Sequence, residues 1–365
     1  MTPREQEILA LVRSDPLISQ ADIATRLGIS RSAVAGHIMN LTGKGIIKGR
    51  GYVLASDPFV ALVGGANMDI CAAPASRLRM HDSNPGSVVT SPGGVARNMA
   101  ENLARLGVDC RLIAAVGADH HGDLLVQQGR AAGIDMDAVL RFDDAQTSTY
   151  VSLLDESGDM HVGVNDMLIV DKLQPDRLRT HEQMLRQASL VVLDTNLPDT
   201  SIAYLCEILN DRPLFVDAVS VAKAHRIGPH LESVHTLKAG SMEAEALCGM
   251  RCRTEKQLAK AARKFHRLGT RRVFISLGEK GIFYSDGNEA GIEPVPGARP
   301  AVTNANGAGD ALFAGIAYGW LNEWPLMKTI RFAMSAAGLA MSHRSTINPD
   351  MSRTSVEKHL AAVYD

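Results

Sequence analysis

FVALVGG, at residues 59–65, is an unbroken run of apolar residues that ends in two glycines. Further runs of the same kind follow along the chain, and several are rich in β-branched residues. They are LIAAVG (112–117), LVVLD (190–194), LFVD (214–217), VHTLK (234–238) and RVFISLG (272–278). Runs that are apolar at every position are typical of parallel strands with both faces buried. The sequence therefore predicts a buried, mostly parallel sheet.

Helical patterns lie between these runs, for example ARNMAENLARLG (96–107) and EKQLAKAARKFHRLG (255–269). Strands that alternate with helices predict a doubly wound α/β sheet. One segment does not fit, because STYVSLLDESGDMHVGV (148–164) alternates apolar and polar residues around a turn at 156–159. This pattern predicts a β-hairpin. With strands at about 70–90, it predicts a small separate sheet that acts as a lid, as a dimer interface, or as both.

Residues 1–55 follow a different pattern. Apolar residues at helical spacing predict one helix around residues 8–12, a second capped by Ser19 and ended by Gly28, and a third capped by Ser30. The segment GIIKGRGYVL (45–54) then predicts a short hairpin, or wing. This order resembles the winged helix-turn-helix heads of bacterial regulators. ASDPF (55–59) is the expected linker to a body that spans residues 58–365.

The charge of this head favours contact with DNA. Seven Lys or Arg residues against four Asp or Glu residues give residues 1–55 a net charge of +3, which leaves −5 for the rest of the chain. The side chains expected to face a groove or its phosphates are Ser30, Arg31, Ser32, His37, Lys44, Lys48 and Arg50. The alternative is a small helical domain used only for contacts between copies of the chain.

The overall composition excludes several classes of protein. A formal charge of −2 over 365 residues does not fit a general binder of polyanions. The five cysteines are scattered, which predicts reduced thiols in the cytoplasm rather than disulfides. The first residues are charged and do not form a signal peptide, and no apolar run approaches the roughly 18 residues of a membrane span. We therefore expect a cytoplasmic protein with no membrane partner.

TNANGAGDALFAG (303–315) has the strongest chemical signal. Gly307, Ala308 and Gly309 come before a helix of small residues, and backbone N–H groups at a helix N-terminus bind anions. Asp310 follows at once, where a carboxylate takes a proton from a hydroxyl that attacks a phosphoryl group. The alternative is an acid that only balances the helix dipole. The chain contains no P-loop motif, so a kinase of that class is excluded.

Other polar residues follow the apolar runs, at the sheet edge where α/β proteins bind ligands. Asn67 and Asp69 in GGANMD suit a sugar diol or simply form a turn, and Gly93-Gly94 with Asn98 lets the backbone approach a ligand. Asp194 and Asn196 are expected to point into the crevice. Glu243 lies early on a predicted helix, where an acid pairs well with the helix dipole. Ser276, Gly278 and Gly281 in SLGEKG either wrap a phosphate or form a hairpin turn.

GGANMD, PGGVARN, SLGEKG and NGAGDALFAG, in this order and at these separations, resemble the ribokinase-like (PfkB) family of carbohydrate and nucleoside kinases. The resemblance covers about residues 58–365. PGGVARNMAENLARLG and LLDESGDMHVGVNDM are most similar to the pseudouridine kinase branch, some members of which have a winged head. The resemblance implies phosphorylation of a primary hydroxyl by ATP with Mg²⁺. Lid-mediated dimers and dimeric winged heads both favour a homodimer over a monomer.

The resemblance also implies roles for residues at matching positions. Asp310 is the general base, and Gly307, Ala308 and Gly309 form the anion hole. The substrate is held by Asn67, Asp69, Gly93, Gly94 and Asn98, with Asn165 and Asp166 near the base of a nucleoside. The nucleotide is bound by Asn196, Lys238, Ser276, Gly278, Gly281 and Asn306. Glu243 organises magnesium through water.

Two positions depart from the family pattern. Gly240 stands where the family has the Asn of an N-x-x-E motif, which predicts altered handling of magnesium. Asn304-Ala305-Asn306 replaces the usual Asp-Thr-Thr, so a potassium requirement of the usual type is not expected, although a monovalent cation is possible. Two hypotheses follow. The body is a nucleoside or pentose kinase, or it only senses such a ligand for a transcriptional regulator.

Overall fold

The computed structural model describes residues 1–48, 58–158, 160–296 and 306–364. The chain divides into two compact units, residues 1–58 and residues 59–365, and each is described by itself. The expected wing lies outside the described residues from position 49 onward, Arg50 included, as does most of the expected linker. No helix within the described ranges is long and apolar enough to span a membrane.

The head contains the three helices that the sequence predicts. They are α1 (Pro3–Ser14), α2 (Gln20–Leu27) and α3 (Arg31–Gly43). Ser19 and Ser30 cap α2 and α3 by accepting hydrogen bonds from the backbone N–H groups of Asp22 and Ala33, which confirms both predicted caps. The helices pack around a small core that includes Ile8, Val12, Ile23, Val34, Ile38 and Leu41.

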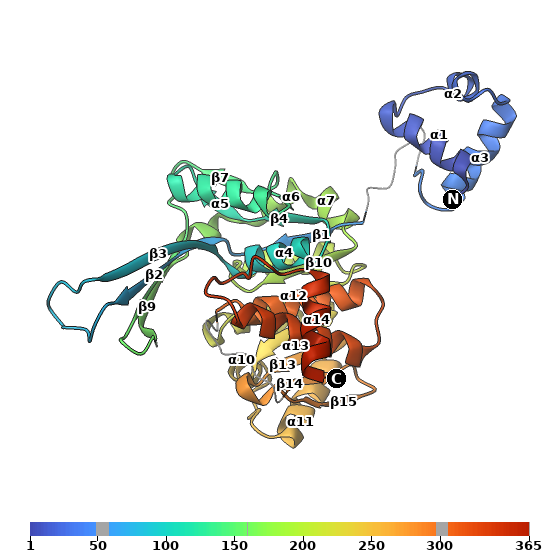
Figure 1. Ribbon diagram of the computed structural model, residues 1–365. Coiled ribbons are helices and arrows are strands. Elements are labelled where there is room, and N and C mark those ends of the chain that lie inside the picture. Colours follow the sequence, from blue (N-terminus) through green and yellow to red (C-terminus); the bar gives the residue numbers. More distant parts are fainter. Residues whose placement is uncertain (49–57, 159, 297–305, 365) are drawn as a thin grey trace. The chain divides into compact units, whose positions relative to one another are not determined.

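The body is built on a nine-stranded sheet (Figure 1). In sheet order its strands are β15 (Ala290–Glu293), β14 (Ile282–Ser285), β13 (Arg272–Ser276), β12 (Thr236–Gly240), β11 (Leu214–Asp217), β10 (Leu190–Asp194), β1 (Val60–Val63), β4 (Cys110–Ile113) and β6 (Ile134–Asp135). The strands from β13 to β6 pair in parallel, and β14 and β15 are antiparallel. The predicted doubly wound sheet is confirmed.

Alternate residues of the central strands β1, β10 and β13 enter two separate cores, one on either face of this sheet. On β1, Val60 and Leu62 face one core, whereas Ala61 and Val63 face the other. The first core is covered by α4 (Val95–Arg105), α5 (His120–Ala131), α12 (Ala308–Leu321), α13 (Leu326–Met341) and α14 (Arg353–Tyr364). The second is covered by α6 (Pro175–Arg179), α7 (Glu182–Gln187), α8 (Asp199–Ile208), α9 (Val221–Ala224), α10 (Ser241–Cys248) and α11 (Glu255–Arg267). Short 3₁₀ turns are η1 (Leu168–Lys172), η2 (His225–Ser233) and η3 (Gly278–Lys280).

A second sheet, of four strands, projects from the body at the place of the predicted lid (Figure 1). Its order is β3 (Gly86–Gly93), β2 (Asn67–Pro74), β8 (Thr149–Leu154) and β9 (Met160–Asp166). The predicted hairpin is therefore present, and it lies in a separate sheet as expected. Because directly paired residues share a face, the register gives the lid one face with Asp69, Ser91 and Tyr150 and another face with Ile70 and Val151.

Two predicted strands differ from the observed ones. The run at 112–117 is not one strand, because it breaks at Ala114 into β4 and β5 (Ala115–Gly117), and β5 pairs instead with β7 (Leu140–Phe142). The run at 234–238 begins its strand later, at Thr236, and continues to Gly240. Apolar composition marks both runs as buried, but it does not show where backbone pairing changes partner.

Candidate active site

The first turn of α12 has the geometry of an anion site. Gly307 precedes the helix with a φ of 80°, and an added Cβ there would overlap the carbonyl oxygen of Thr346. Only glycine therefore fits without strain. Among the residues that the structure describes, no side chain caps this helix end, so its backbone N–H groups remain as donors. The positive end of the helix dipole adds to their attraction for an anion.

Asp310 lies in this first turn and is only 9% exposed. Burial raises the pKa of its carboxyl group to about 7. The ammonium group of Lys238 opposes this shift, and the carboxylate of Asp217 adds to it. Asn98 donates a hydrogen bond of 2.8 Å from Nδ2 to Asp310 Oδ2. Because a general base works best when its pKa lies near the operating pH, Asp310 suits proton abstraction at neutral pH.

A buried lysine brings positive charge to the same turn. Lys238, on β12, contacts Asp217 Oδ2 at 2.8 Å, and Asp217 ends the neighbouring strand β11. Gly309 leaves room for the ammonium group, since an added Cβ there would lie 3.1 Å from Lys238 Nζ. Asp217 is missing from the sequence prediction, although it ends the run LFVD as Asp194 ends LVVLD. Lys238 therefore lies where an anion at the start of α12 would meet it.

The predicted sugar site lies where the lid joins the body. Asn67 Nδ2 donates a hydrogen bond of 2.6 Å to Asp69 Oδ1. Burial raises the pKa of Asp69, and the hydrogen bond from Asn67 works against that shift. Gly93 pairs beside these residues on β3, where an added Cβ would overlap the Asp69 carboxylate. Gly94 has a φ of 99°, and an added Cβ would lie 2.5 Å from the backbone of Gly65. Both glycines are therefore required by close packing.

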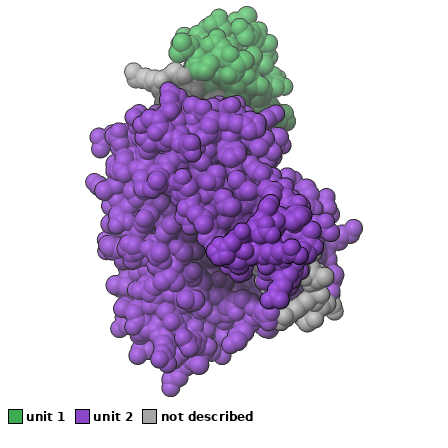
Figure 2. Space-filling model, turned by 90° about the vertical axis from the view of Figure 1, so that its left-hand side faces the viewer, with its two compact units in different colours: residues 1–58 green, residues 59–365 purple. Residues whose placement is uncertain are grey.

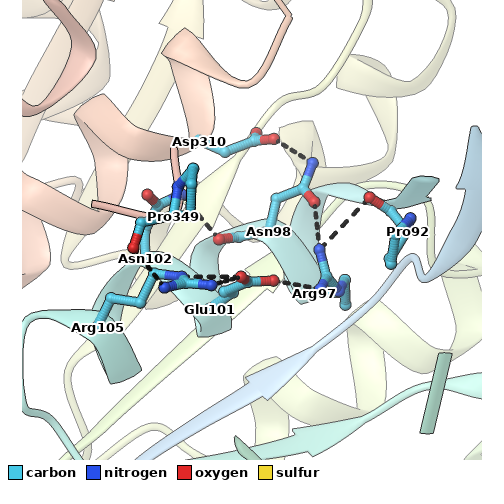
Figure 3. Close-up of polar contacts among 8 residues, drawn as sticks. All are labelled: Pro92, Arg97, Asn98, Glu101, Asn102, Arg105, Asp310 and Pro349. Atoms are coloured by element: carbon cyan, nitrogen blue, oxygen red, sulfur yellow. Dashed lines mark hydrogen bonds and ion pairs between the residues drawn. The ribbon is translucent and has the colours of Figure 1, made fainter. Parts of the chain in front are cut away.

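Asn98 connects the helix α4 that follows these glycines with the helix that carries Asp310 (Figure 3). Its amide nitrogen contacts Asp310, and its backbone carbonyl oxygen accepts a hydrogen bond of 2.9 Å from Asn102. The structure thus brings together Asn98 and Asp310, which are 212 residues apart in the sequence. The sequence predicts both residues, but it does not predict this contact between them.

A cavity of about 450 Å³ adjoins the same turn of α12. Its lining includes Ala308 and Gly309 together with Ser276, Gly278 and Gly281, which the sequence assigns to the nucleotide. His359 and Val363 of α14 close another side. This volume lies within the usual range for small-molecule sites. Figure 2 views the body from the side on which the lid projects, and its surface is hollowed beside the lid.

Glu243 lies in the first turn of α10, and its side chain folds back over Gly240. An added Cβ at Gly240 would overlap Glu243 Oε2, so this carboxylate occupies space that a larger residue at 240 would need. Glu243 also acts electrostatically on Lys238. Within the described ranges no group of three His, Cys, Asp or Glu side chains is placed to hold a metal alone. One carboxylate near phosphates is a fitting environment for Mg²⁺, which keeps waters and phosphate ligands.

Asp194 and Asn196 form a hydrogen-bonded network at the end of β10. Asp194 is fully buried and accepts hydrogen bonds of 2.9 Å from the backbone N–H groups of Gly65 and Ala96. Asn196 donates to Asp194 at 2.7 Å and accepts from Lys223 at 2.5 Å. These contacts fix the loop after β1, and binding of the nucleotide by Asn196 stays a prediction.

The register of the lid strands places Asn165 and Asp166 on opposite faces of the lid. Asn165 pairs with Tyr150, which pairs with Asp69, so Asn165 lies on the face of the predicted sugar site. Asp166 pairs with Thr149 and lies on the opposite face. Contact with a nucleoside base therefore stays a prediction for Asn165, whereas Asp166 lies on the other face of the lid. Adjacent residues of an extended strand cannot point to the same side. Tyr150, which the sequence does not single out, shares the face of Asn165.

The remaining predicted positions lie directly before α12 and in the head. Asn306 directly precedes Gly307, and positions 304 and 305, on which the potassium expectation rests, lie outside the described residues. In the head, Arg31, Ser32 and Lys48 are exposed, and His37 is partly exposed. Ser30 serves as the cap of α3, with its Oγ 3.0 Å from Ser32 Oγ. Lys44 is exposed and forms an ion pair with Glu5 at 2.8 Å, and its contact with a phosphate stays a prediction.

Residues 57–353 match the model of the pfkB family carbohydrate kinases. The chain belongs to this family. Residues 1–48 match a winged helix-turn-helix DNA-binding model. The pfkB match covers the parallel sheet, the lid and the turn that carries Asp310, so the predicted ribokinase-like fold is confirmed. The predicted winged helix-turn-helix domain is likewise confirmed.

Several pfkB relatives resemble the chain over most of its length. Pseudouridine kinase of Escherichia coli is 37% identical over 300 residues, which cover 82% of this chain and 95% of that protein. The uncharacterized sugar kinase YeiI of Escherichia coli is 35% identical over 356 residues, 96% of this chain and 97% of that protein. The structure of Arabidopsis thaliana ribokinase complexed with ribose and ATP has a TM-score of 0.76 at 26% identity, covering 84% of this chain and 99% of that chain. This pfkB member is an ATP-dependent phosphotransferase, a sugar or nucleoside kinase with a winged head.

Proposed function

We propose that the body transfers the terminal phosphoryl group of ATP to the 5′-hydroxyl of a nucleoside, with pseudouridine the first candidate and a pentose the second. The position of Asp310 carries this proposal, because a buried carboxyl group with a pKa of about 7 lies beside uncapped amides. The 37% identity to a pseudouridine kinase supports the choice of substrate. Asn165 and Tyr150 lie on the lid face where the nucleoside base would meet them.

The proposed mechanism uses this chain's residues in a fixed order. Asp69 and Asn67 hold the sugar hydroxyls, and Asp310 removes the proton from the hydroxyl that attacks phosphorus. The bond from that oxygen to the γ-phosphorus forms as the bond to ADP breaks. Negative charge on the transferred group is stabilised by the N–H groups at the start of α12 and by Lys238. Glu243 would hold Mg²⁺ through water, and the ion would neutralise charge on the ATP phosphates.

The proposal is tested by incubating the purified protein with Mg-ATP and pseudouridine, uridine, inosine or ribose. We expect ADP to form fastest with pseudouridine, with one phosphate added to that nucleoside by mass spectrometry. ADP formation with ribose alone would reassign the substrate to a pentose. A protein that forms no ADP with any of the four acceptors would contradict the kinase proposal and favour the sensor.

We also propose that the head binds DNA and that the protein acts in the cytoplasm. All five cysteines are free, which fits a reducing compartment.

Arg31 and Ser32 are exposed at the N-terminus of α3, the helix of the head that would enter a DNA groove. Deleting residues 1–55 should abolish binding to the DNA upstream of its own gene, and Arg31→Ala should weaken that binding by about tenfold. Unchanged binding after the deletion would rule out this role for the head.

Gly240 favours a second candidate function, a regulator whose body only senses its ligand. The family Asn is absent there, and Glu243 fills the space instead. In this case a nucleoside would change DNA binding without being phosphorylated. The two functions are distinguished by measuring how the nucleoside changes DNA binding with and without ATP. A sensor shows the same change in both cases. A kinase converts the nucleoside into its product when ATP is present, so the change in DNA binding is then lost.

We propose that the apolar face of the lid joins two copies of the chain. Val88, Val151, Val162 and Val164 all lie on this face, and Val164 is 64% exposed. Exposed apolar patches of this kind mark interaction sites. We expect Val164→Asp to convert a dimer into a monomer by light scattering. Val89→Asp is the matched control, because Val89 is 61% exposed on the opposite face. A wild-type monomer, or equal effects of both changes, would contradict this interface.

A further inference from the structure

Helix α4 carries three charged residues one turn apart, Arg97, Glu101 and Arg105 (Figure 3). Glu101 is buried and contacts both arginines, Arg97 through Oε2 and Arg105 through Oε1 at 2.8 Å. Arg105 reaches the surface and also donates a hydrogen bond of 2.8 Å to the carbonyl oxygen of Pro349. Glu101 therefore has a cation available to it even without Arg97.

Arg97 is the unusual member of this row, because it is only 3% exposed. Its Nη1 lies 3.3 Å from Asn98 Oδ1 and 3.4 Å from the carbonyl oxygen of Pro92 (Figure 3). Burying a guanidinium group costs free energy that only well-placed partners offset. Since Arg105 already neutralises Glu101, pairing with Glu101 does not by itself account for a second, buried arginine.

The contact with Asn98 supplies a reason. An amide has one end that accepts hydrogen bonds and one that donates them. Here Oδ1 faces the guanidinium of Arg97, and Nδ2 faces the carboxylate of Asp310. A flipped amide would place its oxygen against that carboxylate and its NH₂ group against the guanidinium, which are two repulsive contacts. Arginine has no acceptor and does not lose its proton in proteins, so it permits only the observed orientation.

The same guanidinium also acts on the sugar site. Its charge favours the ionised form of Asp69, whose pKa is raised by burial, with Asn67 and Arg97 opposing that rise. Arg97 thus acts on both carboxylates of the proposed reaction, on Asp69 through its charge and on Asp310 through Asn98. One of them must accept a proton, and the other must hold hydroxyl groups.

We propose that Arg97 is a positioning residue for phosphoryl transfer, which fixes the direction of the Asn98 amide so that its NH₂ group stays on Asp310. This proposal rests on the proposed role of Asp310 as the general base. Arg97 touches neither reacting group, and it acts through Asn98. Without it, the amide is free to rotate, and Asp310 loses the donor that stabilises its ionised form.

The test compares Arg97→Met with Arg105→Met in the full-length protein. Both changes remove one arginine from the same carboxylate of the same helix, but only Arg97 contacts Asn98. The readout is the titration of the Asp310 carboxyl group by ¹³C NMR, assigned with Asp310→Asn. We expect Arg97→Met to raise the midpoint by about one pH unit and Arg105→Met to leave it unchanged. Turnover should fall by about tenfold in Arg97→Met alone.

The proposal is overturned if Arg97→Met leaves the titration of Asp310 in place, or if Arg105→Met moves it as far. If Arg97→Met does not fold, Arg97→Lys provides the test instead. A lysine keeps the positive charge but lacks the planar guanidinium group, which contacts Glu101 and Asn98 at the same time. An upward shift in Arg97→Lys supports the proposal, and a wild-type titration overturns it. The titration needs no turnover, so a failure of the kinase proposal would be seen separately, as a wild-type protein that forms no ADP.

Discussion

Replacing Asp310 with Asn is expected to lower turnover by about a hundred- to ten-thousandfold, because it removes the proposed general base and keeps the side-chain shape. Binding of ATP and of the nucleoside should survive, since neither depends on proton transfer. Calorimetry with each ligand separates this outcome from a damaged site. Turnover within a few-fold of the wild type would show that another group removes the proton.

The same residue predicts how activity depends on pH. Burial raises the pKa of Asp310 to about 7, so its ionised, basic form dominates only above that pH. In the wild type, kcat/KM should therefore fall below pH 7, by about tenfold for each further unit. The residual activity of Asp310→Asn should show no such limb near pH 7. A wild-type profile that stays flat down to pH 5 would contradict this assignment.

The thermal stability of the Asp310→Asn variant provides the control for its expected loss of turnover. A carboxyl group with a raised pKa binds its proton more tightly in the folded state than in the unfolded state. Its contribution to stability is present at low pH and is lost as the pH rises to about 7. Asp310→Asn should therefore melt higher than the wild type at pH 8, with little difference at pH 4. Asp194→Asn should instead melt lower, because Asp194 accepts backbone N–H bonds from Gly65 and Ala96.

The sheet was predictable because most of its strands are mainly apolar runs without an alternating pattern, and burial on both faces leaves few other folds for such runs. The separate lid was predictable because residues 148–164 change to an alternating pattern. Strand ends were less predictable, since the run at 112–117 contains no residue that marks the change of sheet at Ala114. Pairing partners are tertiary information that local composition does not contain.

The candidate site residues Gly93, Asn98 and Asp310 could be named from the sequence because they lie where glycines and polar residues break apolar runs. Asp194 carries the same local signal as Asp217, yet one fixes a loop and the other pairs with Lys238. Only the position of each strand in the sheet distinguishes them. Arg97 was not predicted, because an arginine in a helical pattern is usually exposed, and its burial depends on packing against Pro92 and Glu101.

Gly307→Ala is expected to lower turnover by about a hundred- to a thousandfold, the usual loss when one donor of an anion hole is displaced. The reason is steric. Gly307 has a left-handed φ of 80°, and the added methyl group would overlap the carbonyl oxygen of Thr346. Either that segment or the first turn of α12 must move, and the N–H groups of Ala308 and Gly309 belong to that turn. Affinity for ATP should fall with turnover, because the same amides are proposed to receive its terminal phosphate.

Gly287→Ala is the matched control for this change. Gly287 also has a left-handed φ, of 91°, but an added Cβ there meets no atom within 4 Å. It lies in the turn between β14 and β15, so its substitution brings only the conformational cost of about 1–2 kcal/mol. Both variants should lose thermal stability, but only Gly307→Ala should lose turnover and ATP affinity. If Gly307→Ala turned over like Gly287→Ala, phosphate would have to bind away from this helix, and Asp310 would no longer lie beside the reacting group.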